Sequence, residues 1–196
     1  MVLHFGFDLD NTLINYDLSA VEYSRLNNLP DNQTMSSLRA YYIATKDSNA
    51  WAKAQSWIYT DGLEWAEVSS GATDTIQKLI SVGYKISIIS HKTEFGPSQY
   101  GGVPLRVAAT DWITNSALIQ FFPKLDNVYF TGSVREKISL IQEQKLSHYV
   151  DDLIKIFLHD AFPKHNLKSY IYKPSGKLPD WLIPLNDFKS LFNNPL

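Results

Sequence analysis

The chain of 196 residues contains no cysteine, which removes several kinds of chemistry at once. Disulfide bonds, thiolate metal sites and a cysteine nucleophile are excluded, although this absence does not identify a compartment. Apolar runs long enough to span a membrane are also absent, so no membrane partner is expected. The start, MVLHFGFDLD, lacks the basic segment and apolar stretch of a signal peptide, and we therefore expect a cytoplasmic protein.

The sequence also has little excess of charge of either sign. Its 18 basic and 20 acidic residues give a formal net charge of -2. A surface with so little net charge does not favour binding of nucleic acids, so any phosphate-bearing partner has to be bound by a few residues at one site. With 44% hydrophobic residues, the chain can build one well-packed domain and a small inserted subdomain. These properties do not determine the oligomeric state.

Short apolar runs alternate with helical stretches along most of the chain. The runs are residues 2–7, 84–90, 127–132, 146–152 and 167–172. This alternation predicts the α/β class, with a Rossmann-like three-layer α/β/α core built around a parallel sheet. The best-marked helix, residues 71–83, has apolar residues at helical spacing and stops at Gly83, a favourable C-terminal cap.

Residues 14–70 interrupt this alternation. Acidic and amide-rich turns separate three aromatic-rich helical pieces, which lie near 17–28, 34–46 and 48–59. The pattern predicts a small helical cap subdomain, inserted into a core of residues 1–13 and 71–196. The aromatic side chains are expected to form the cap's own core rather than a substrate cage.

Two further parts of the chain look irregular. Residues 91–104 contain three glycines and two prolines, which predicts a loop before a helix near 105–121. A long loop at the end of a strand often has a functional reason. The proline-rich tail after Tyr172, which includes Pro195, is expected to wrap irregularly over the surface.

Polar residues lie at four of the predicted strand ends. The first strand end carries Asp8 and Asp10, and the second carries Ser90. The third is followed by a turn that leads to Lys137, and the fourth carries Asp151 and Asp152. Because ligands bind outside the carboxyl ends of the strands in open parallel sheets, these residues are candidates for one site. Ser133 and Glu136 have the spacing of a capping box, which starts a helix and puts Lys137 in its first turn.

Several carboxylates in one cleft would raise each other's pKa unless a cation lay among them. Mg²⁺ suits such a site, since it takes one or two carboxylates and leaves positions for water and a phosphate oxygen. One aspartate of the first pair can then attack phosphorus, while the other acts as general acid and base. Ser90 and Lys137 would hold the phosphoryl oxygens.

The four motifs, in this order, resemble those of the haloacid dehalogenase (HAD) superfamily. They are Asp8-Leu9-Asp10-Asn11-Thr12, then Ser90, then Lys137, then Tyr149-Val150-Asp151-Asp152. The resemblance covers residues 1 to 173, and the insertion of residues 14–70 has the position of that family's helical C1-type cap. It implies that a small phosphorylated metabolite is hydrolysed with Mg²⁺ through an aspartyl-phosphate.

The resemblance also implies a role for each motif residue. Asp8 would be the nucleophile and a metal ligand, and Asp10 the general acid/base and a ligand through its backbone carbonyl. Ser90 and Lys137 would bind phosphate, and Thr12 with Asn11 would support the loop. Asp152 is favoured as the direct metal ligand with Asp151 behind it, but the two could exchange roles.

The roles of several other charged residues are left open by the sequence. Arg135 is a rival to Lys137 as the phosphate contact, and His91 and Lys92 either reach substrate or lie in a solvated loop. The remaining arginines, Arg25, Arg39 and Arg106, are either surface charges or recognise a second anionic group of the substrate.

The function also has alternatives. Asp10 favours a phosphate ester over a carbon-halogen or carbon-phosphorus bond, because the branches that cleave those bonds usually lack this aspartate. A 5'-nucleotidase, a phosphomutase, and a non-catalytic binding protein that retains the fold are the other readings.

Overall fold

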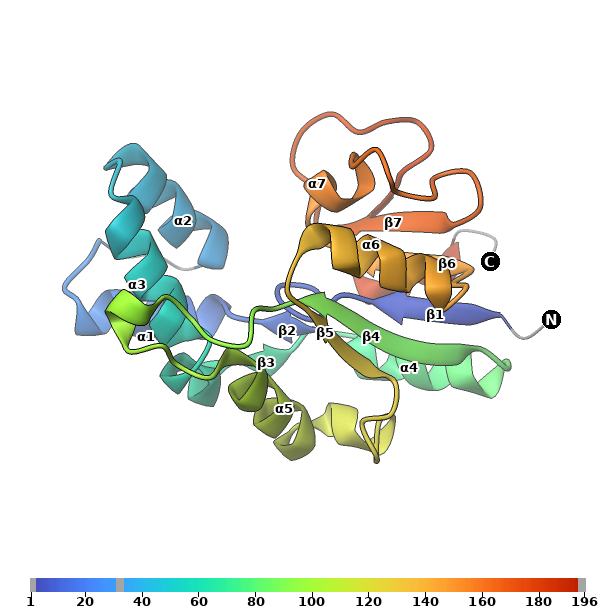
Figure 1. The fold of residues 1–196 in the computed structure, drawn as a ribbon, viewed down its shortest axis with the longest axis horizontal. Helices are drawn as coiled ribbons and strands as arrows, with labels where there is room; N and C mark the ends of the chain where they lie inside the picture. Colours follow the sequence, from blue (N-terminus) through green and yellow to red (C-terminus); the bar gives the residue numbers. More distant parts are fainter. Residues whose placement is uncertain (1–2, 31–33, 194–196) are drawn as a thin grey trace. The chain divides into compact units, whose positions relative to one another are not determined.

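The computed structural model describes residues 3–30 and 34–193 and divides the chain into two compact units (Figure 1). The first, which we call the core unit, consists of Met1–Leu13, Val68–Lys92 and Ala117–Leu196. The second, which we call the helical unit, consists of Ile14–Glu67 and Thr93–Ser116. Val2 and Pro195, which belong to the predicted first strand and tail, lie outside the described residues.

A six-stranded sheet forms the centre of the core unit, and all its neighbouring strands run parallel. Its order is β5 (Val128–Thr131), β4 (Lys85–His91), β1 (His4–Phe7), β6 (His148–Asp151), β7 (Lys168–Tyr172) and β8 (Ile183–Leu185). The five runs predicted as strands correspond to β1, β4, β5, β6 and β7. The carboxyl ends of these strands therefore meet at one edge of the sheet.

Helices cover both faces of this sheet, with α4 (Ala72–Ser81) on one face and α6 (Val134–Glu143) with α7 (Ile154–Phe157) on the other (Figure 1). Every residue of β1 and β6 is buried, as expected for strands covered on both sides. Successive side chains of a strand point to opposite faces. Ile89 and Tyr149 pack with Ile138 of α6, whereas Phe7 lies against Phe188 on the other face. The predicted three-layer α/β/α core is confirmed.

Gly6 leaves room for the ring of Tyr149, which packs with Ile138 of α6. A Cβ atom at this position would collide with Leu146 Cδ1 and lie 2.9 Å from Cδ2 of Tyr149. Both neighbours are buried, so the clash cannot be relieved toward solvent. The smallest residue is therefore required in the middle of β1.

We expect Gly6→Ala to lower the free energy of unfolding by about 1–3 kcal/mol, because it overpacks a filled interior. Urea unfolding measures the change. The Leu146→Val background removes the nearest clashing atom, so the same substitution should cost less there. An equal cost in both backgrounds would show that packing against Leu146 is not the cause.

His148 is buried in an aromatic stack on the face of the sheet opposite α6. Its ring stacks on Phe5 at 4.8 Å between centroids and meets Tyr84 edge-on at 5.4 Å. Burial, and then the charge of Lys168, lowers the pKa of His148 from 6.5 to about 4. Below pH 6.5 the unfolded chain therefore binds a proton that the folded chain takes up only near pH 4.

The free energy of unfolding should accordingly fall as the pH is lowered from 6.5 to 4, with His148 contributing about 1–2 kcal/mol after allowance for solvent screening. His148→Phe keeps an aromatic ring but cannot titrate. The difference between wild-type and variant unfolding curves over this pH range isolates the effect. A difference independent of pH would contradict it.

The tail is more ordered than predicted. Ile183–Leu185 forms β8, which pairs in parallel with β7, and Phe188–Asn193 forms the 3-10 helix η4. The side chains of Leu182, Leu185, Phe188 and Leu191 are buried. The prediction of an irregular surface segment was wrong because Pro184 tolerates an edge strand, where no donor is needed on the open side.

The helical unit contains the three predicted helices, α1 (Asp17–Leu26), α2 (Met35–Ala44) and α3 (Ser48–Ile58), followed by the 3-10 helix η1 (Asp61–Trp65). Its interior is aromatic, as Trp57 packs between Tyr23 and Trp65 with ring centroids 5.5 and 5.6 Å away. The chain enters and leaves through β2 (Ile14–Asn15) and β3 (Glu67–Val68), which pair as a small sheet.

The structure assigns one segment differently from the sequence prediction. Residues 93–116, expected in the core, belong to the helical unit. Tyr100, in the 3-10 helix η2 (Ser98–Tyr100), donates its hydroxyl to the Asn49 carbonyl at 2.7 Å, and Trp112 of α5 (Leu105–Asn115) donates its indole N–H to Ala66. These distant contacts are invisible in the sequence.

The helix predicted near 105–121 also ends earlier than expected. Ser116 is extended and its hydroxyl donates to the Ile113 carbonyl, which closes α5 before the separate 3-10 helix η3 (Ala117–Gln120). In the described parts of the chain, no helix combines the length and apolar character needed to cross a membrane.

Candidate active site

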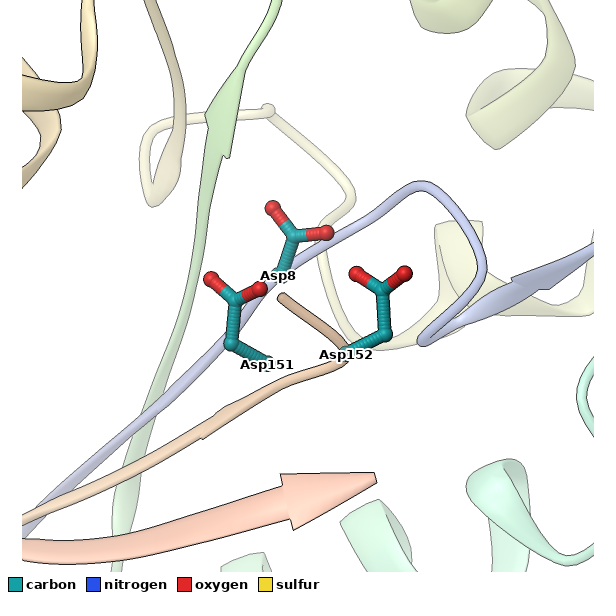
Figure 2. A group of neighbouring side chains, drawn as sticks. All are labelled: Asp8, Asp151 and Asp152. Atoms are coloured by element: carbon teal, nitrogen blue, oxygen red, sulfur yellow. The ribbon is translucent and has the colours of Figure 1, made fainter. Parts of the chain in front are cut away.

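Three aspartates of the core unit meet at the carboxyl ends of two neighbouring strands. Asp8 directly follows β1, Asp151 ends β6, and Asp152 comes next (Figure 2). The Asp8 N–H donates to the Val150 carbonyl at 2.8 Å, which extends the pairing of these strands to the site. One carboxylate oxygen from each aspartate lies within 4.8 Å of the others, close enough to share a cation.

Lys137 links two of these carboxylates. Its Nζ atom lies 2.5 Å from Asp8 Oδ1 and 2.6 Å from Asp151 Oδ2, and its side chain is fully buried. Although burial by itself would lower the pKa of Lys137, the two aspartates raise it above its ordinary value, so the amine stays charged. Arg135, the rival cation, is exposed.

The helix start that positions Lys137 forms as the spacing predicts, with one difference. Ser133 precedes α6 and its Oγ atom accepts from the Glu136 N–H at 3.1 Å. The Glu136 carboxylate accepts a hydrogen bond from the Gly132 N–H, whereas in a capping box it would accept from the Ser133 N–H. Lys137 therefore sits in the first turn, next to the strand ends.

Asp151 and Asp152 have different surroundings. Asp151 Oδ2 accepts from Lys137 and from the Tyr149 hydroxyl at 3.1 Å, and its Oδ1 accepts from the Leu153 N–H at 2.8 Å. Among the described residues, nothing donates a hydrogen bond to the Asp152 carboxylate. Asp152 is therefore the better placed of the two to take a metal ion, while Asp151 is already held by protein groups.

The electrostatics of the site call for a cation. Burial, opposed by Lys137 and reinforced by Asp151 and Asp10, raises the pKa of Asp8 to about 7. Burial and the charges of Asp151 and Asp8 also raise the pKa of Asp152 well above its usual range. A divalent cation among the carboxylates would offset this repulsion and keep them ionised.

Two hydroxyls at the site are buried but unpaired. In the described part of the chain, neither Ser90 Oγ nor Thr12 Oγ1 has a hydrogen-bond partner. A buried donor without an acceptor costs free energy, so each such atom calls for an explanation. A phosphoryl oxygen is a suitable acceptor for Ser90, which lies in β4 beside β1.

The loop after Asp8 turns sharply. Asn11 has a φ of 57°, in the left-handed region, which asparagine tolerates better than most residues. The N–H of Leu13 donates to the Leu9 carbonyl at 2.9 Å and closes the turn. This conformation gives a local reason for the residue type at position 11.

Asp10, the second aspartate of the loop, pairs with a lysine. Lys92 Nζ lies 2.8 Å from Asp10 Oδ2, and only 4% of Lys92 is exposed. The alternative of a solvated loop is therefore wrong for Lys92. His91 is partly buried.

The remaining candidate arginines lie in the helical unit. Arg25 forms a salt bridge with Glu22 on the exposed surface of α1, and Arg39 is exposed. Arg106 is partly buried. The salt bridge of Arg25 with Glu22 does not by itself indicate an anion-binding group.

The sequence assigns no role of its own to Tyr149, and it leaves Lys92 open between reaching substrate and lying in a solvated loop. Each stands two positions from a predicted site residue: Tyr149 precedes Asp151 in β6, and Lys92 follows Ser90, one residue beyond the end of β4. Because side chains at i and i+2 share a face, this spacing was the available signal.

Comparisons with known proteins identify the fold. No family model matches the chain, and no curated protein matches its sequence. A Clostridium difficile protein assigned as a phosphatase is similar in structure, with a TM-score of 0.63, 13% identity and coverage of 96% of each chain.

Two further solved structures agree with this match. A HAD-superfamily hydrolase of subfamily IA from Geobacter sulfurreducens has a TM-score of 0.57 at 9% identity, over 98% of this chain and 95% of that one. A Haemophilus somnus protein predicted to be a phosphoglycolate phosphatase has a TM-score of 0.54 at 14% identity, over 97% and 96%. The resemblance noted in the sequence is confirmed at the level of structure: the chain has the fold of HAD-superfamily hydrolases.

Proposed function

We propose that the protein is a Mg²⁺-dependent phosphatase that hydrolyses a small phosphomonoester through an aspartyl-phosphate on Asp8. The observation that carries this proposal is the cluster of the buried Asp8, Lys137 and Asp151 with the partly buried Asp152. In the neighbouring strand β4, the buried Ser90 hydroxyl has no hydrogen-bond partner among the described residues. The structural similarity to hydrolases and phosphatases supports it.

The residues fit a magnesium ion. Asp8, Asp152 and the backbone carbonyl of Asp10 would hold it, since oxygen ligands with at least one carboxylate are what this ion prefers. Four carboxylates face two ammonium groups here, those of Lys92 and Lys137, and a divalent cation would balance the difference. When bound, the ion supplies positive charge that stabilises the anionic phosphoryl group.

In the first step, an Asp8 carboxylate oxygen attacks phosphorus, forming a new P–O bond as the bond to the leaving oxygen breaks. Asp10 delivers its proton to that oxygen, which leaves as the alcohol. Lys137 and the Ser90 hydroxyl bind the phosphoryl oxygens and stabilise the charge that spreads over them.

In the second step, Asp10, now a carboxylate, takes a proton from a water molecule. The resulting hydroxide attacks phosphorus, the bond to Asp8 breaks, and inorganic phosphate is released. Asp151 keeps Lys137 in place through both steps. The helical unit is proposed to act as the cap that selects the substrate, and a cytoplasmic location stays a prediction.

The test is release of inorganic phosphate from an aryl phosphate and a panel of phosphorylated metabolites, with Mg²⁺ or with a chelator. Release that depends on Mg²⁺ supports the proposal, and the panel ranks substrates, including nucleotides. Transfer of phosphate between positions of a sugar would instead indicate a phosphomutase. A folded protein inactive on the whole panel would contradict the phosphatase and favour a binding protein.

Magnesium should also stabilise the folded protein. At a concentration of 100 times its Kd, the ion is expected to add about 2.7 kcal/mol, because it binds the folded state. Asp152→Asn should remove most of this gain, whereas Asn at the exposed Asp160 should preserve it. Thermal unfolding with and without Mg²⁺ measures both. Equal gains in the two variants would place the ion elsewhere.

A further inference from the structure

Lys92 is a charged side chain in the core unit for which the proposed chemistry has no role. It follows β4, and its N–H donates to the Thr131 carbonyl at 3.0 Å, so the pairing with β5 continues to this residue. Alternation along the strand puts Lys92 on the same side as Ser90. Burying a lysine costs solvation and side-chain freedom, and this cost is offset only where its charge is paired.

The partner of Lys92 is the carboxylate proposed to transfer the proton. Lys92 Nζ contacts Asp10 Oδ2 at 2.8 Å, and 16% of the Asp10 side chain is exposed. Asp10 precedes Asn11 in the loop after β1, and Lys92 directly follows β4, which pairs with both β1 and β5. The backbone of Lys92 is therefore tied to the edge of the sheet where Asp10 lies.

The two buried lysines contact different carboxylates of the site. Lys137 contacts Asp8 and Asp151, and Lys92 contacts Asp10. The two members of the Asp-x-Asp motif are therefore contacted by different lysines, although only one residue separates them.

We propose that Lys92 is a positioning residue that holds Asp10 for proton transfer to the leaving group, an inference that rests on the proposed function. Its ammonium donates to Oδ2 and fixes the orientation of the carboxyl group that exchanges the proton. The O–H bond of the Asp10 carboxyl group breaks as the bond between that proton and the leaving oxygen forms, and Lys92 keeps its own protons. This contact holds the carboxyl group in line both before and after the transfer.

Such a role predicts a dependence on the leaving group. A basic alcohol needs a proton as it leaves, whereas an acidic phenol such as dinitrophenol leaves without one. Lys92→Met should lower kcat/KM about 10- to 100-fold on an alkyl phosphate. This ratio reports on the steps up to departure of the alcohol, so the later hydrolysis step, in which Asp10 also acts, does not enter it. On dinitrophenyl phosphate the loss should stay below about threefold.

Three variants make the test specific. Asp10→Asn should show the same leaving-group pattern with a larger loss, and the double variant should be no worse than Asp10→Asn, because Lys92 acts through Asp10. Lys92→Arg should recover part of the alkyl phosphate activity. Lys85→Met, at the exposed opposite end of β4, is the matched control and should behave as wild type.

Thermal unfolding verifies that each variant is folded at the assay temperature. An equal loss on both substrates, a change confined to KM, or losses that add in the double variant would overturn the positioning role while leaving the phosphatase proposal intact. A wild-type protein that releases phosphate from neither ester would overturn the proposed function and this inference together.

Discussion

Asp8→Asn is expected to lower phosphate release by at least about 10⁴-fold, equivalent to about 5 kcal/mol of transition-state stabilisation. The amide keeps the shape of the side chain but cannot form the covalent intermediate. Asp8 is buried at the end of β1, where water does not readily substitute for the missing nucleophile. Steady-state phosphate release with Mg²⁺ measures the loss.

The covalent intermediate itself provides a second readout. Wild-type protein quenched in acid during turnover of a phosphate-labelled ester should carry label that hydroxylamine removes, as expected of an acyl phosphate. Asp8→Asn should carry none, and Asp160→Asn should label like wild type. Labelling of the Asp8 variant would show that another residue is the nucleophile.

Lys137→Met is expected to have the largest effect on stability, lowering the free energy of unfolding by about 3–5 kcal/mol. Removing the ammonium leaves Asp8 and Asp151 buried without the cation that both contact. The new thioether cannot donate a hydrogen bond to either carboxylate. Urea unfolding in the absence of Mg²⁺ measures the cost, and phosphate release should be lost in parallel.

A double-mutant cycle separates this charge effect from simple repacking. In the Asp8→Asn background one of the two unpaired carboxylates is gone, so Lys137→Met should cost less by about 1 kcal/mol or more. Met at the exposed Lys85 is the control and should change stability by less than about 0.5 kcal/mol. Strict additivity between positions 8 and 137 would contradict the pairing.

The sheet was predictable because its strands are short apolar runs buried on both faces. Such runs stand out from the helical stretches between them, and the runs 2–7 and 146–152 correspond to β1 and β6. The strand β8 was missed because its three residues include a proline and follow a polar, proline-rich stretch. Its place in the sheet comes from pairing with β7, which local pattern does not encode.

The placement of residues at strand ends was also within reach of sequence reasoning. A parallel sheet puts its carboxyl ends on one edge, so Asp8 and Asp151 had to come close once the strands were identified. The cap signal at Ser133 likewise fixed the register that brings Lys137 to the site. These inferences need only the period of a strand and the start of a helix.

The sequence by itself therefore determined the α/β class, the edge at which the site lies, and the residue types that meet there, because each follows from local periodicity and order along the chain. Tertiary structure alone decided which carboxylate each lysine contacts, which acidic residue of the 151–152 pair is held by protein hydrogen bonds, and that residues 93–116 join the helical unit. Those outcomes depend on the side-chain reach, burial and hydrogen bonds of residues far apart in the chain, and no local pattern records them.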